Sequence, residues 1–307
     1  MAAMTDFIKR LKIATGFLIF FVLLVISTVG WDADHTNLII LVMSLLLAHK
    51  YSYRAVLVWL SFLLFLIIYD TLPAFPNYTF SDVHILEPYN LELYLFGIAD
   101  GAKEVVPNEW FITRTNDFLS LIAGFSYILW MPLPMIYAVY LFRKDKENLF
   151  LFGSTFLLTC IIGMIGYYIY PAAPPWYYIN HGVGTDFTIS GSEGLLSEFD
   201  RIIGSPVFNS IYAKGGNVFC AIPSLHCAYP VVCFLVARRI RKKWHMVIFT
   251  LWAFGTWFAA VYSQHHYIID VILGVVCAIF SFWLVQTALK YESVKKLQKS
   301  YVLELSS

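Results

Sequence analysis

The sequence predicts an all-α polytopic membrane protein with about eight transmembrane helices. Hydrophobic residues make up 59% of the 307 residues and charged residues only 13%, about half the charged share of an ordinary soluble domain. Most of the chain must therefore face lipid or neighbours that are themselves buried in lipid. The apolar residues gather in eight segments, at residues 13–31, 36–49, 55–69, 118–142, 149–170, 223–240, 244–263 and 266–286.

The first three segments form a predicted N-terminal transmembrane part, residues 1–70. Segments two and three are shorter than the roughly 20 residues that a span needs, so we expect them to tilt or to lie partly in the interface. Segment one has a basic flank like that of a signal peptide, but no small-x-small cleavage site follows it before Trp31. We therefore expect a retained helix.

The basic residues predict the orientation of these helices. Of the 21 Lys and Arg residues, 17 lie at the two ends of the chain or in the turns after segments two, four and six. The sequence therefore predicts cytoplasmic N- and C-termini, including a tail at 291–307, and places the starts of segments six and eight in the periplasm or lumen. Four basic residues fall on the predicted outer side, Lys103, Arg114, Arg201 and Lys214.

Two long segments on the outer side interrupt the helices, residues 71–117 and 171–222, and long loops on one face usually carry a functional site. In the first, leucines alternate with acidic residues, which predicts a helix lying on the bilayer surface as a scaffold over the site. The second opens with prolines and Trp176, which end the preceding helix and anchor the interface. Apolar residues at helical spacing in 195–203 predict a further surface helix packed on the bilayer, where this loop could control lipid entry.

Two short motifs open segments six and eight on that side, Pro223-Ser224-Leu225-His226 and His265-His266-Tyr267-Ile268-Ile269-Asp270. Ionisable groups at the mouth of a membrane helix cost free energy unless they are paired or used. The i,i+4 spacing of His266 and Asp270 predicts that they share one helix face, so that Asp270 accepts a hydrogen bond from one ring nitrogen and frees the other. Pro223 at the first helical position would leave backbone N–H groups free to bind a phosphate.

These residues predict phosphoryl chemistry carried by His226, His266 and Asp270. In this interpretation His266 attacks phosphorus or positions the attacking alcohol, Asp270 holds its tautomer, and His226 exchanges a proton with the leaving or entering oxygen. Ser224 could donate to a phosphoryl oxygen. A lone interfacial histidine is more often structural, but three residues in two motifs favour chemistry. The outer motifs offer no further His or Cys at metal-ligand spacing, and the five cysteines predict neither a disulfide framework nor a redox site, so we expect no metal and no cofactor.

The two motifs resemble those of the type-2 phosphatidic acid phosphatase (PAP2) superfamily, which carries Pro-Ser-x-His and a later His-x-x-x-Asp. With the run Pro171-Ala172-Ala173-Pro174-Pro175-Trp176, the sequence is similar to the inositol phosphorylceramide synthase branch of that superfamily. The resemblance covers a core at about residues 118–290 and implies six helices, metal-independent chemistry and a histidine nucleophile. It implies that His266 is the nucleophile, that Asp270 supports it and that His226 is the general acid and base.

Two phosphate-binding features of the phosphatases in this superfamily are missing. No basic residue lies between Lys146 and Arg201, so the Lys-x6-Arg-Pro motif is absent, and Ala259 and Ala260 stand where a Ser-Arg pair is expected. A phosphomonoester carries about two negative charges near neutral pH and a diester one, so the loss of two cations disfavours the monoester more. The sequence therefore predicts a glycerophospholipid donor and a lipid alcohol as acceptor, which an approach lined by aromatic residues would favour over water.

The leading hypothesis is a phosphotransferase that moves phosphoinositol from phosphatidylinositol to ceramide or dihydroceramide and releases diacylglycerol. A phosphoethanolamine or phosphocholine transferase would use the same histidines, and a lipid phosphate phosphatase remains open if Arg114, Arg201 or Lys214 folds into the site. A hypothesis of a different class is a lipid or solute transporter with a proton relay through His266, Asp270 and Asp70. A rhomboid-like protease is weaker, because Ser224 lacks a Gly-x-Ser-x-Gly setting.

Further candidate contacts lie at the same predicted boundary. Asp70 ends segment three and Asp117 opens segment four, where either could bind inositol hydroxyls, although capping or orienting a neighbour is the commoner role. Tyr170, Trp176, His265 and Tyr267 are candidate head-group contacts or supports of the catalytic residues. The predicted partners are membrane lipids and not nucleic acid, and the sequence leaves the head group, the ceramide chain length and the oligomeric state open.

Overall fold

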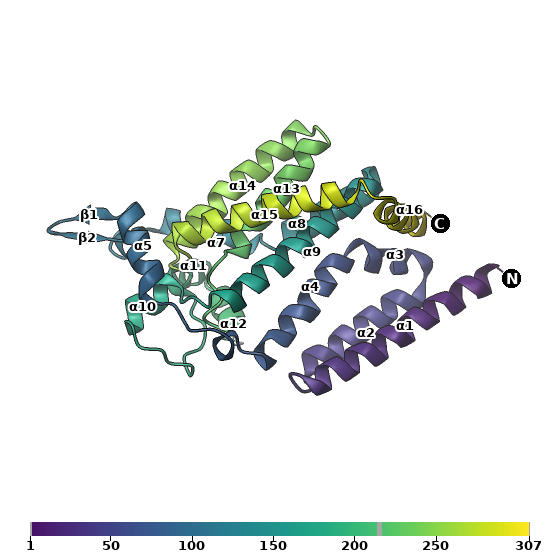
Figure 1. The fold of residues 1–307 in the computed structure, drawn as a ribbon, viewed down its shortest axis with the longest axis horizontal. Coiled ribbons are helices and arrows are strands. Elements are labelled where there is room, and N and C mark those ends of the chain that lie inside the picture. The colour runs from purple at the N-terminus through teal and green to yellow at the C-terminus, as the bar shows by residue number, and fades with distance from the viewer. Residues whose placement is uncertain (1, 214–216, 307) are drawn as a thin grey trace.

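Each of the eight apolar segments is helical in the computed structural model, which describes residues 2–213 and 217–306 (Figure 1). The protein is thus an all-α polytopic membrane protein, as predicted. The helices in these segments are α1 (Ala2–Ser27), α2 (Ala33–Ala48), α3 (Lys50–Val58) with α4 (Leu60–Thr71), α7 (Asp117–Ile128) with α8 (Pro132–Lys144), α9 (Lys146–Ile169), α13 (Leu225–Arg239), α14 (Lys243–Tyr262) and α15 (Ile268–Ala288).

Not every one of these helices is long enough to cross a bilayer by itself. Within the described residues, four helices have the length and hydropathy of a span, namely α1, α9, α14 and α15. Two further spans arise if each bent pair counts as one, with a bend of 61° between α3 and α4 and of 47° between α7 and α8. The second bend coincides with Pro132 at the start of α8, since proline cannot continue the preceding helix. α2 and α13 have 16 and 15 residues and are shorter than a span.

Helix α13 lies at the centre of the bundle and packs against α14, α15 and α9. Small side chains line it, and Ala228, Cys233 and Ala237 are fully buried. Small residues let helix backbones approach closely, which is how helices associate in a membrane, where water supplies no driving force between them. The α1–α2 hairpin packs instead on α3 and α4, through contacts such as Phe21 and Val25 with Ile67.

The first long outer segment contains more secondary structure than the predicted surface helix. It holds η1 (Leu72–Ala74), η2 (Asn77–Thr79), α5 (Leu86–Phe96), strands β1 (Ile98–Asp100) and β2 (Lys103–Val105), and α6 (Pro107–Trp110). β1 and β2 pair antiparallel, with Ala99 opposite Glu104, and form a hairpin that projects at the left of Figure 1. The alternation of leucines and acids predicted α5 but not the hairpin.

The second long outer segment contains α10 (Pro175–His181), η3 (Gly194–Leu196), α11 (Ser197–Ile203) and α12 (Val207–Tyr212). α9 ends just before Pro171, as the prolines predicted. Residues 195–203 are helical, as their spacing predicted, and α11 packs against α7. The reason is a notch in α7: a Cβ on Gly124 would lie 2.0 Å from the Phe199 ring, so this ring fills protein space that only glycine leaves open.

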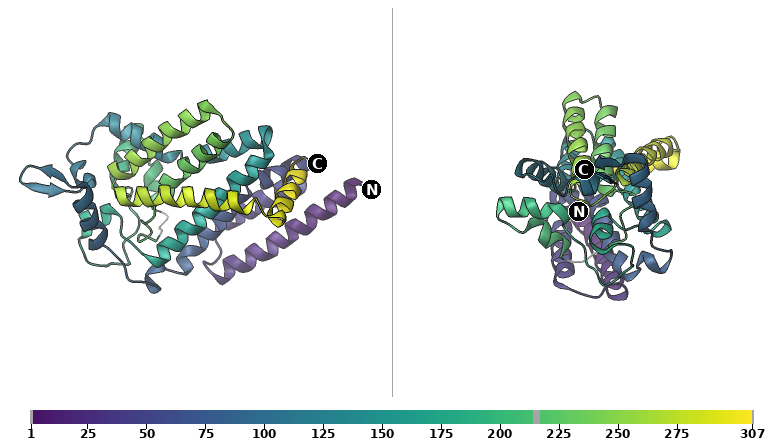
Figure 2. Two further views of the ribbon diagram at one scale, coloured as in Figure 1. Left: turned by 45° about the horizontal axis from the view of Figure 1, so that its top comes forward. Right: turned by 90° about the vertical axis from the view of Figure 1, so that its left-hand side faces the viewer.

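The predicted C-terminal tail forms a helix. α16 (Glu292–Ser306) crosses the end of the bundle, where the Tyr301 hydroxyl donates to the Leu57 carbonyl over 2.8 Å and the Gln298 amide donates to the Glu147 carbonyl over 3.1 Å. Both ends of the chain lie on this side, whereas α5, α10, α11 and the hairpin lie at the opposite end (Figures 1 and 2). The second panel of Figure 2 looks onto that opposite end, where the two motifs meet.

Candidate active site

His226 lies in the first turn of α13. The helix begins at Leu225, with Ser224 as its N-cap in an extended conformation, so the prediction that Pro223 is the first helical residue was wrong. The Ser224 hydroxyl oxygen accepts a hydrogen bond from the Cys227 N–H over 3.4 Å. A serine at this position satisfies one of the N–H groups that a helix start leaves unpaired, and it fixes the turn from which His226 projects.

Two glycines of neighbouring helices make room for this turn. On α15, a Cβ at Gly274 would lie 2.2 Å from the Ser224 carbonyl oxygen, and on α9 a Cβ at Gly163 would lie 2.5 Å from the Leu225 side chain. The first of these contacts is to backbone, which cannot move aside. Gly274 therefore sets how closely the start of α13 approaches α15, the helix that carries Asp270.

His266 lies in the turn between α14 and α15. The N–H groups of His265 and His266 both donate to the Ala260 carbonyl, over 3.1 and 3.0 Å. Gln264 adopts a left-handed conformation with φ of 66°, which bends the chain sharply at this point. A left-handed residue other than glycine costs on the order of 1 kcal/mol, so the surrounding structure must hold this turn in place.

The predicted shared helix face of His266 and Asp270 was wrong, because α15 begins only at Ile268 and Tyr267 is its extended N-cap. The two side chains nevertheless meet. His266 Nδ1 lies 3.4 Å from Asp270 Oδ2, and the same carboxylate oxygen accepts the Tyr267 N–H over 2.9 Å. Asp270 is fully buried. His266 Nδ1 is thus the ring nitrogen that faces the carboxylate, at ion-pair distance and without a hydrogen bond, and Nε2 is the nitrogen that faces away from it.

The two motifs come together in space. The rings of His226 and His266 have centroids 6.1 Å apart and are inclined by 49°. Tyr127 stacks on His226 at 4.7 Å and Trp130 meets it edge-on at 5.1 Å. Aromatic rings thus wall one side of the pair, while His226 itself keeps partial exposure.

Burial determines the charge state of the histidines in the turn. It lowers the pKa of His266 to about 4, against the opposing effect of the Ala221 carbonyl, and the pKa of His265 to about 3. Both imidazoles are therefore neutral near pH 7. A neutral imidazole can accept a proton or attack an electrophile, which a protonated one cannot.

The predicted phosphate seat at the start of α13 is smaller than expected. The Ser224 N–H donates to the Asp270 carbonyl over 3.0 Å, and the Cys227 N–H is taken by the Ser224 hydroxyl oxygen. The first N–H groups of a helix have no intrahelical acceptor, so those of Leu225 and His226 remain for a ligand. The Ser224–Asp270 bond also joins the two motifs directly.

The other aromatic and histidine candidates surround this centre at different depths. His265 Nδ1 lies 2.8 Å from the Ser263 hydroxyl, and its ring is 4.7 Å from that of Tyr212 on α12. Tyr170 stacks on His84 at 3.9 Å. Trp176 and Tyr267 are almost fully buried, and the Trp176 N–H donates to the Gln264 carbonyl over 3.0 Å. Tyr170 is partly exposed, whereas His265, Trp176 and Tyr267 are buried around the turn.

The two aspartate candidates are engaged by other partners. Asp70 Oδ2 lies 2.8 Å from His35 Nε2, on the N-terminal helices. Asp117 accepts from Arg201 Nη2 over 2.6 Å in an exposed ion pair that joins α7 to α11. Each therefore has the orienting role that was the commoner expectation, and the structure does not bring them together with His226 and His266.

Two buried polar residues beside the site were not singled out by the sequence analysis. Glu92 on α5 accepts the N–H groups of Ile268 and Ile269 over 2.9 and 3.2 Å. Asn108 on α6 donates to the Val261 and His266 carbonyls, each over 2.9 Å. Both side chains are fully buried. The available signal was that Glu92 stands between two leucines. A glutamate is rarely buried without a partner, so its place in an apolar run indicated a buried polar contact.

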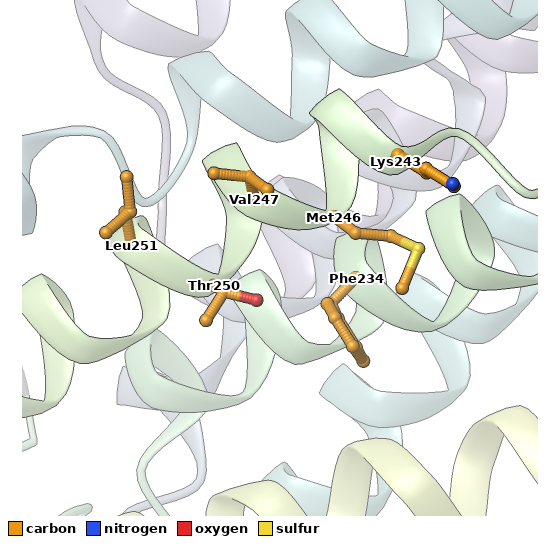
Figure 3. Close-up of a pocket in the computed structure, with 6 residues that line it drawn as sticks. All are labelled: Phe234, Lys243, Met246, Val247, Thr250 and Leu251. Atoms are coloured by element: carbon orange, nitrogen blue, oxygen red, sulfur yellow. The ribbon is translucent and has the colours of Figure 1, made fainter.

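The open hollow shown in Figure 3 lies away from this centre, between α13 and α14. It begins beside Lys243, the first residue of α14, whereas His266 follows the last residue of that helix. Its lining is almost entirely apolar and consists of Phe234, Lys243, Met246, Val247, Thr250 and Leu251. In the described part of the chain, no three His, Cys, Asp or Glu side chains are grouped so that they could hold a metal ion.

Residues 103–284, more than half of the chain, match the family model of the PAP2 superfamily. The chain belongs to the PAP2 superfamily. It is 38% identical over 266 residues to the phosphoinositol dihydroceramide synthase of Bacteroides thetaiotaomicron, a match that covers 86% of this chain and 87% of that protein. No solved structure matches it significantly.

Fungal proteins resemble this PAP2 chain over a shorter stretch. It is 30% identical over 175 residues to an inositol phosphorylceramide synthase of Candida albicans, which covers 55% of this chain and 36% of that protein. It is 28% identical over 167 residues to the catalytic subunit of inositol phosphorylceramide synthase of Saccharomyces cerevisiae, which covers 53% of this chain and 41% of that protein. The chain thus spans about two fifths of the length of these fungal relatives.

Proposed function

We propose that this PAP2 protein is a sphingolipid phosphotransferase that moves phosphoinositol from phosphatidylinositol to ceramide or dihydroceramide and releases diacylglycerol. The observation that carries the proposal is the meeting of His226 and His266, 6.1 Å apart, with Asp270 behind His266 and the open first turn of α13 beside them. The name of the Bacteroides relative, matched over most of both chains, supports the choice of phosphoinositol and of a dihydroceramide acceptor.

The chemistry can follow one of two balanced routes. In a direct transfer, His266 Nε2 takes the proton of the ceramide hydroxyl as its oxygen bonds to phosphorus, the bond from phosphorus to the glycerol oxygen breaks, and a protonated His226 gives that oxygen its proton. In a two-step transfer, His266 Nε2 itself bonds to phosphorus, diacylglycerol leaves with the His226 proton, and the ceramide hydroxyl then returns a proton to His226 and displaces His266. Asp270 stabilises the positively charged imidazole in the direct route.

The charges around the site support a diester donor. Arg114 is held by Asp100 over 2.7 Å on the β hairpin, and Arg201 is held by Asp117 and Glu198. Lys214, the third basic residue considered as a replacement clamp, lies outside the described residues. With two of the three candidate replacement clamps engaged elsewhere, a singly charged phosphodiester is favoured over a doubly charged monoester, and the N–H groups of Leu225 and His226 suit one anionic oxygen.

The surroundings of His226 support a lipid acceptor over water. Tyr127 and Trp130 cover one side of its ring, and η3 closes over the turn that holds His265, where the Leu195 N–H donates to the Ser263 carbonyl. A site from which water is excluded protects an activated phosphoryl group from hydrolysis. We assign His265 and Tyr170 as head-group contacts and Ser224 as a donor to the phosphoryl oxygen.

The orientation in the membrane is also part of the proposal. The N- and C-termini lie at one end of the bundle with the basic ends of α13 and α14, and the site lies at the other end (Figure 1). The positive-inside rule then places the termini in the cytoplasm and the site in the periplasm or lumen. A membrane-impermeant thiol reagent should label Ala102→Cys from outside and Ser300→Cys only after permeabilisation. The reverse pattern would overturn the orientation.

The direct test of the proposed function is lipid product analysis with purified protein in mixed micelles. Phosphatidylinositol plus ceramide should give phosphoinositol-ceramide and an equal amount of diacylglycerol. Phosphate release from phosphatidic acid alone would identify a phosphatase instead, and transfer only from phosphatidylethanolamine or phosphatidylcholine would change the head group. A transporter would change no lipid species. Its relay is less supported, since Asp70 is bonded to His35.

A further inference from the structure

The turn that carries His266 is held from outside the helical core by the first outer segment. Asn108 on α6 donates to the His266 carbonyl over 2.9 Å, and Glu92 on α5 accepts the N–H groups of Ile268 and Ile269. The two side chains therefore hydrogen-bond to the backbone on either side of Tyr267. The backbone groups that they bind belong to the turn that fixes where the His266 ring points.

Glu92 also distinguishes the two helices that begin at the site. The first turn of α13 keeps the N–H groups of Leu225 and His226 open, whereas the corresponding groups of α15 are closed by the Glu92 carboxylate. A helix start carries partial positive charge and binds an anion. Because the Glu92 carboxylate already occupies the start of α15, the start of α13 is the one that is open to a phosphate.

We propose that Glu92 is a positioning residue for the transfer reaction: it anchors the start of α15 so that Asp270 and His266 keep their alignment, and it directs the substrate phosphate to α13. Glu92 does not touch the reacting atoms in this proposal. The inference rests on the proposed function for its activity measurement, and one arm of its test is independent of activity.

The ionisation of Glu92 supplies a readout that a purely structural residue would not give. Burial raises its pKa to about 7, against the two N–H bonds, which lower it, and the Asp270 charge adds to the rise. The ionised form accepts two strong hydrogen bonds, and protonation weakens them. The titratable groups packed around it are Asp270 and Tyr267 at α15, Glu109 on α6, Tyr178 on α10 and Tyr89 on α5 itself. None of these residues carries a positive charge that would offset the raised pKa.

The test compares Glu92→Gln with wild type and with Glu104→Gln, an exposed control on β2 of the same outer segment. Gln keeps the shape and one acceptor but cannot ionise. We expect kcat for phosphoinositol transfer at pH 8 to fall about 10-fold with a KM change under about 3-fold, and the Tm to stay within a few degrees. We also expect the wild-type kcat to rise as the pH passes about 7, and this step to be absent in Glu92→Gln but present in Glu104→Gln.

A second variant and a second measurement separate this inference from the proposed function. Glu92→Asp keeps the charge and should keep the pH step at a reduced kcat. Hydrogen exchange of the Ile268 and Ile269 amides should quicken at least about 5-fold in Glu92→Gln, whatever lipid the protein acts on. If wild type makes no phosphoinositol-ceramide, the proposed function fails while the exchange arm still decides. Unchanged exchange, or a pH step that survives in Glu92→Gln, would overturn the inference.

Discussion

Two histidine–aspartate pairs in this protein look alike in chemistry and differ in setting. His266 faces Asp270 in the core at 3.4 Å, and His35 faces Asp70 on the N-terminal helices at 2.8 Å, with Asp32 at 2.7 Å on its other nitrogen. The tighter pair is the one outside the site. Both ring nitrogens of His35 have carboxylate partners, so this histidine links α2 to α4 and has no atom left for a substrate.

The His266 pair is looser and incomplete, and that is what suits it to chemistry. Only one nitrogen faces a carboxylate, a second histidine faces the ring at 6.1 Å, and an open helix start lies beside both. The two carboxylates also differ in exposure, because Asp270 is fully buried and Asp70 is half-exposed to solvent. Burial keeps the His266 ring neutral. The comparison teaches that a histidine–aspartate contact alone does not mark a catalytic centre. The second histidine and the open helix start beside the pair do.

The sharpest difference between the two pairs is the second histidine. His226→Gln should lower kcat about 10³-fold, because it removes the proton donor and acceptor that faces His266, and general acid–base groups contribute about 10²–10⁴-fold. His245→Gln, on α14 at the opposite end of the bundle, should keep activity within about 2-fold. Rates of phosphoinositol transfer in micelles measure both. Comparable losses in the two variants would mean that His226 has only a structural role.

The carboxylates provide the next contrast. Asp270→Asn should lower kcat about 10²-fold, because an amide cannot hold the His266 tautomer or stabilise its positive form. Asp70→Asn should keep kcat within about 2-fold and lower the Tm by about 2 °C, the cost of one weakened contact between α2 and α4. Paired kinetics and thermal unfolding check this. A larger loss of kcat in Asp70→Asn than in Asp270→Asn would reverse the assignment.

The close approach of α15 to the turn that carries His226 predicts a smaller effect on kcat. Gly274→Ala places a methyl group against the Ser224 carbonyl at a nominal 2.2 Å, so α13 and α15 must move apart and the two motifs lose alignment. We expect kcat to fall about 10-fold with most of the protein still folded. The matched control is Gly16→Ala on α1, where nothing lies within 4 Å of the added atom. Equal activity of the two variants would show that the approach of α13 to α15 is not needed.

The smallest expected effect is a shift in the pH at which activity is lost in acid. His266 must be neutral to react, and burial lowers its pKa to about 4, so its activity is retained above that pH and lost as the pH falls through it. A solvent-exposed histidine would lose activity near pH 6.5. We expect the acid limb of kcat/KM to lie near pH 4 in the Glu92→Gln variant, from which the carboxyl with a pKa of about 7 has been removed. A limb near pH 6.5 in that variant would contradict the buried, neutral His266.

The sequence predicted the helices and the meeting of His226, His266 and Asp270 because both depend on local patterns. Apolar segments bounded by charge identified each of the eight helical regions, and the motifs around His226 and His266 named the residues that the fold brings together. The basic residues and prolines placed both motifs at one end. These signals need only neighbouring residues and the hydrophobicity of the bilayer.

What the sequence missed depends on contacts between distant segments. The i,i+4 rule failed for His266 because Tyr267 is extended, which a spacing cannot reveal. Glu92 and Asn108 contact residues more than 150 positions away, and their partners are backbone groups that carry no sequence signal. The packing of Phe199 into the notch at Gly124 likewise joins residues far apart in the chain. Each of these features requires the fold to be known first.

The central claim is that the His266 pair, and not the His35 pair, carries phosphoinositol transfer. The most direct measurement follows inositol-labelled phosphatidylinositol into ceramide with purified wild type, His266→Ala and His35→Ala side by side. We predict labelled phosphoinositol-ceramide with matching diacylglycerol from wild type and from His35→Ala, within about 3-fold of each other, and none from His266→Ala. Labelled product from His266→Ala at a rate close to that of wild type would contradict the account.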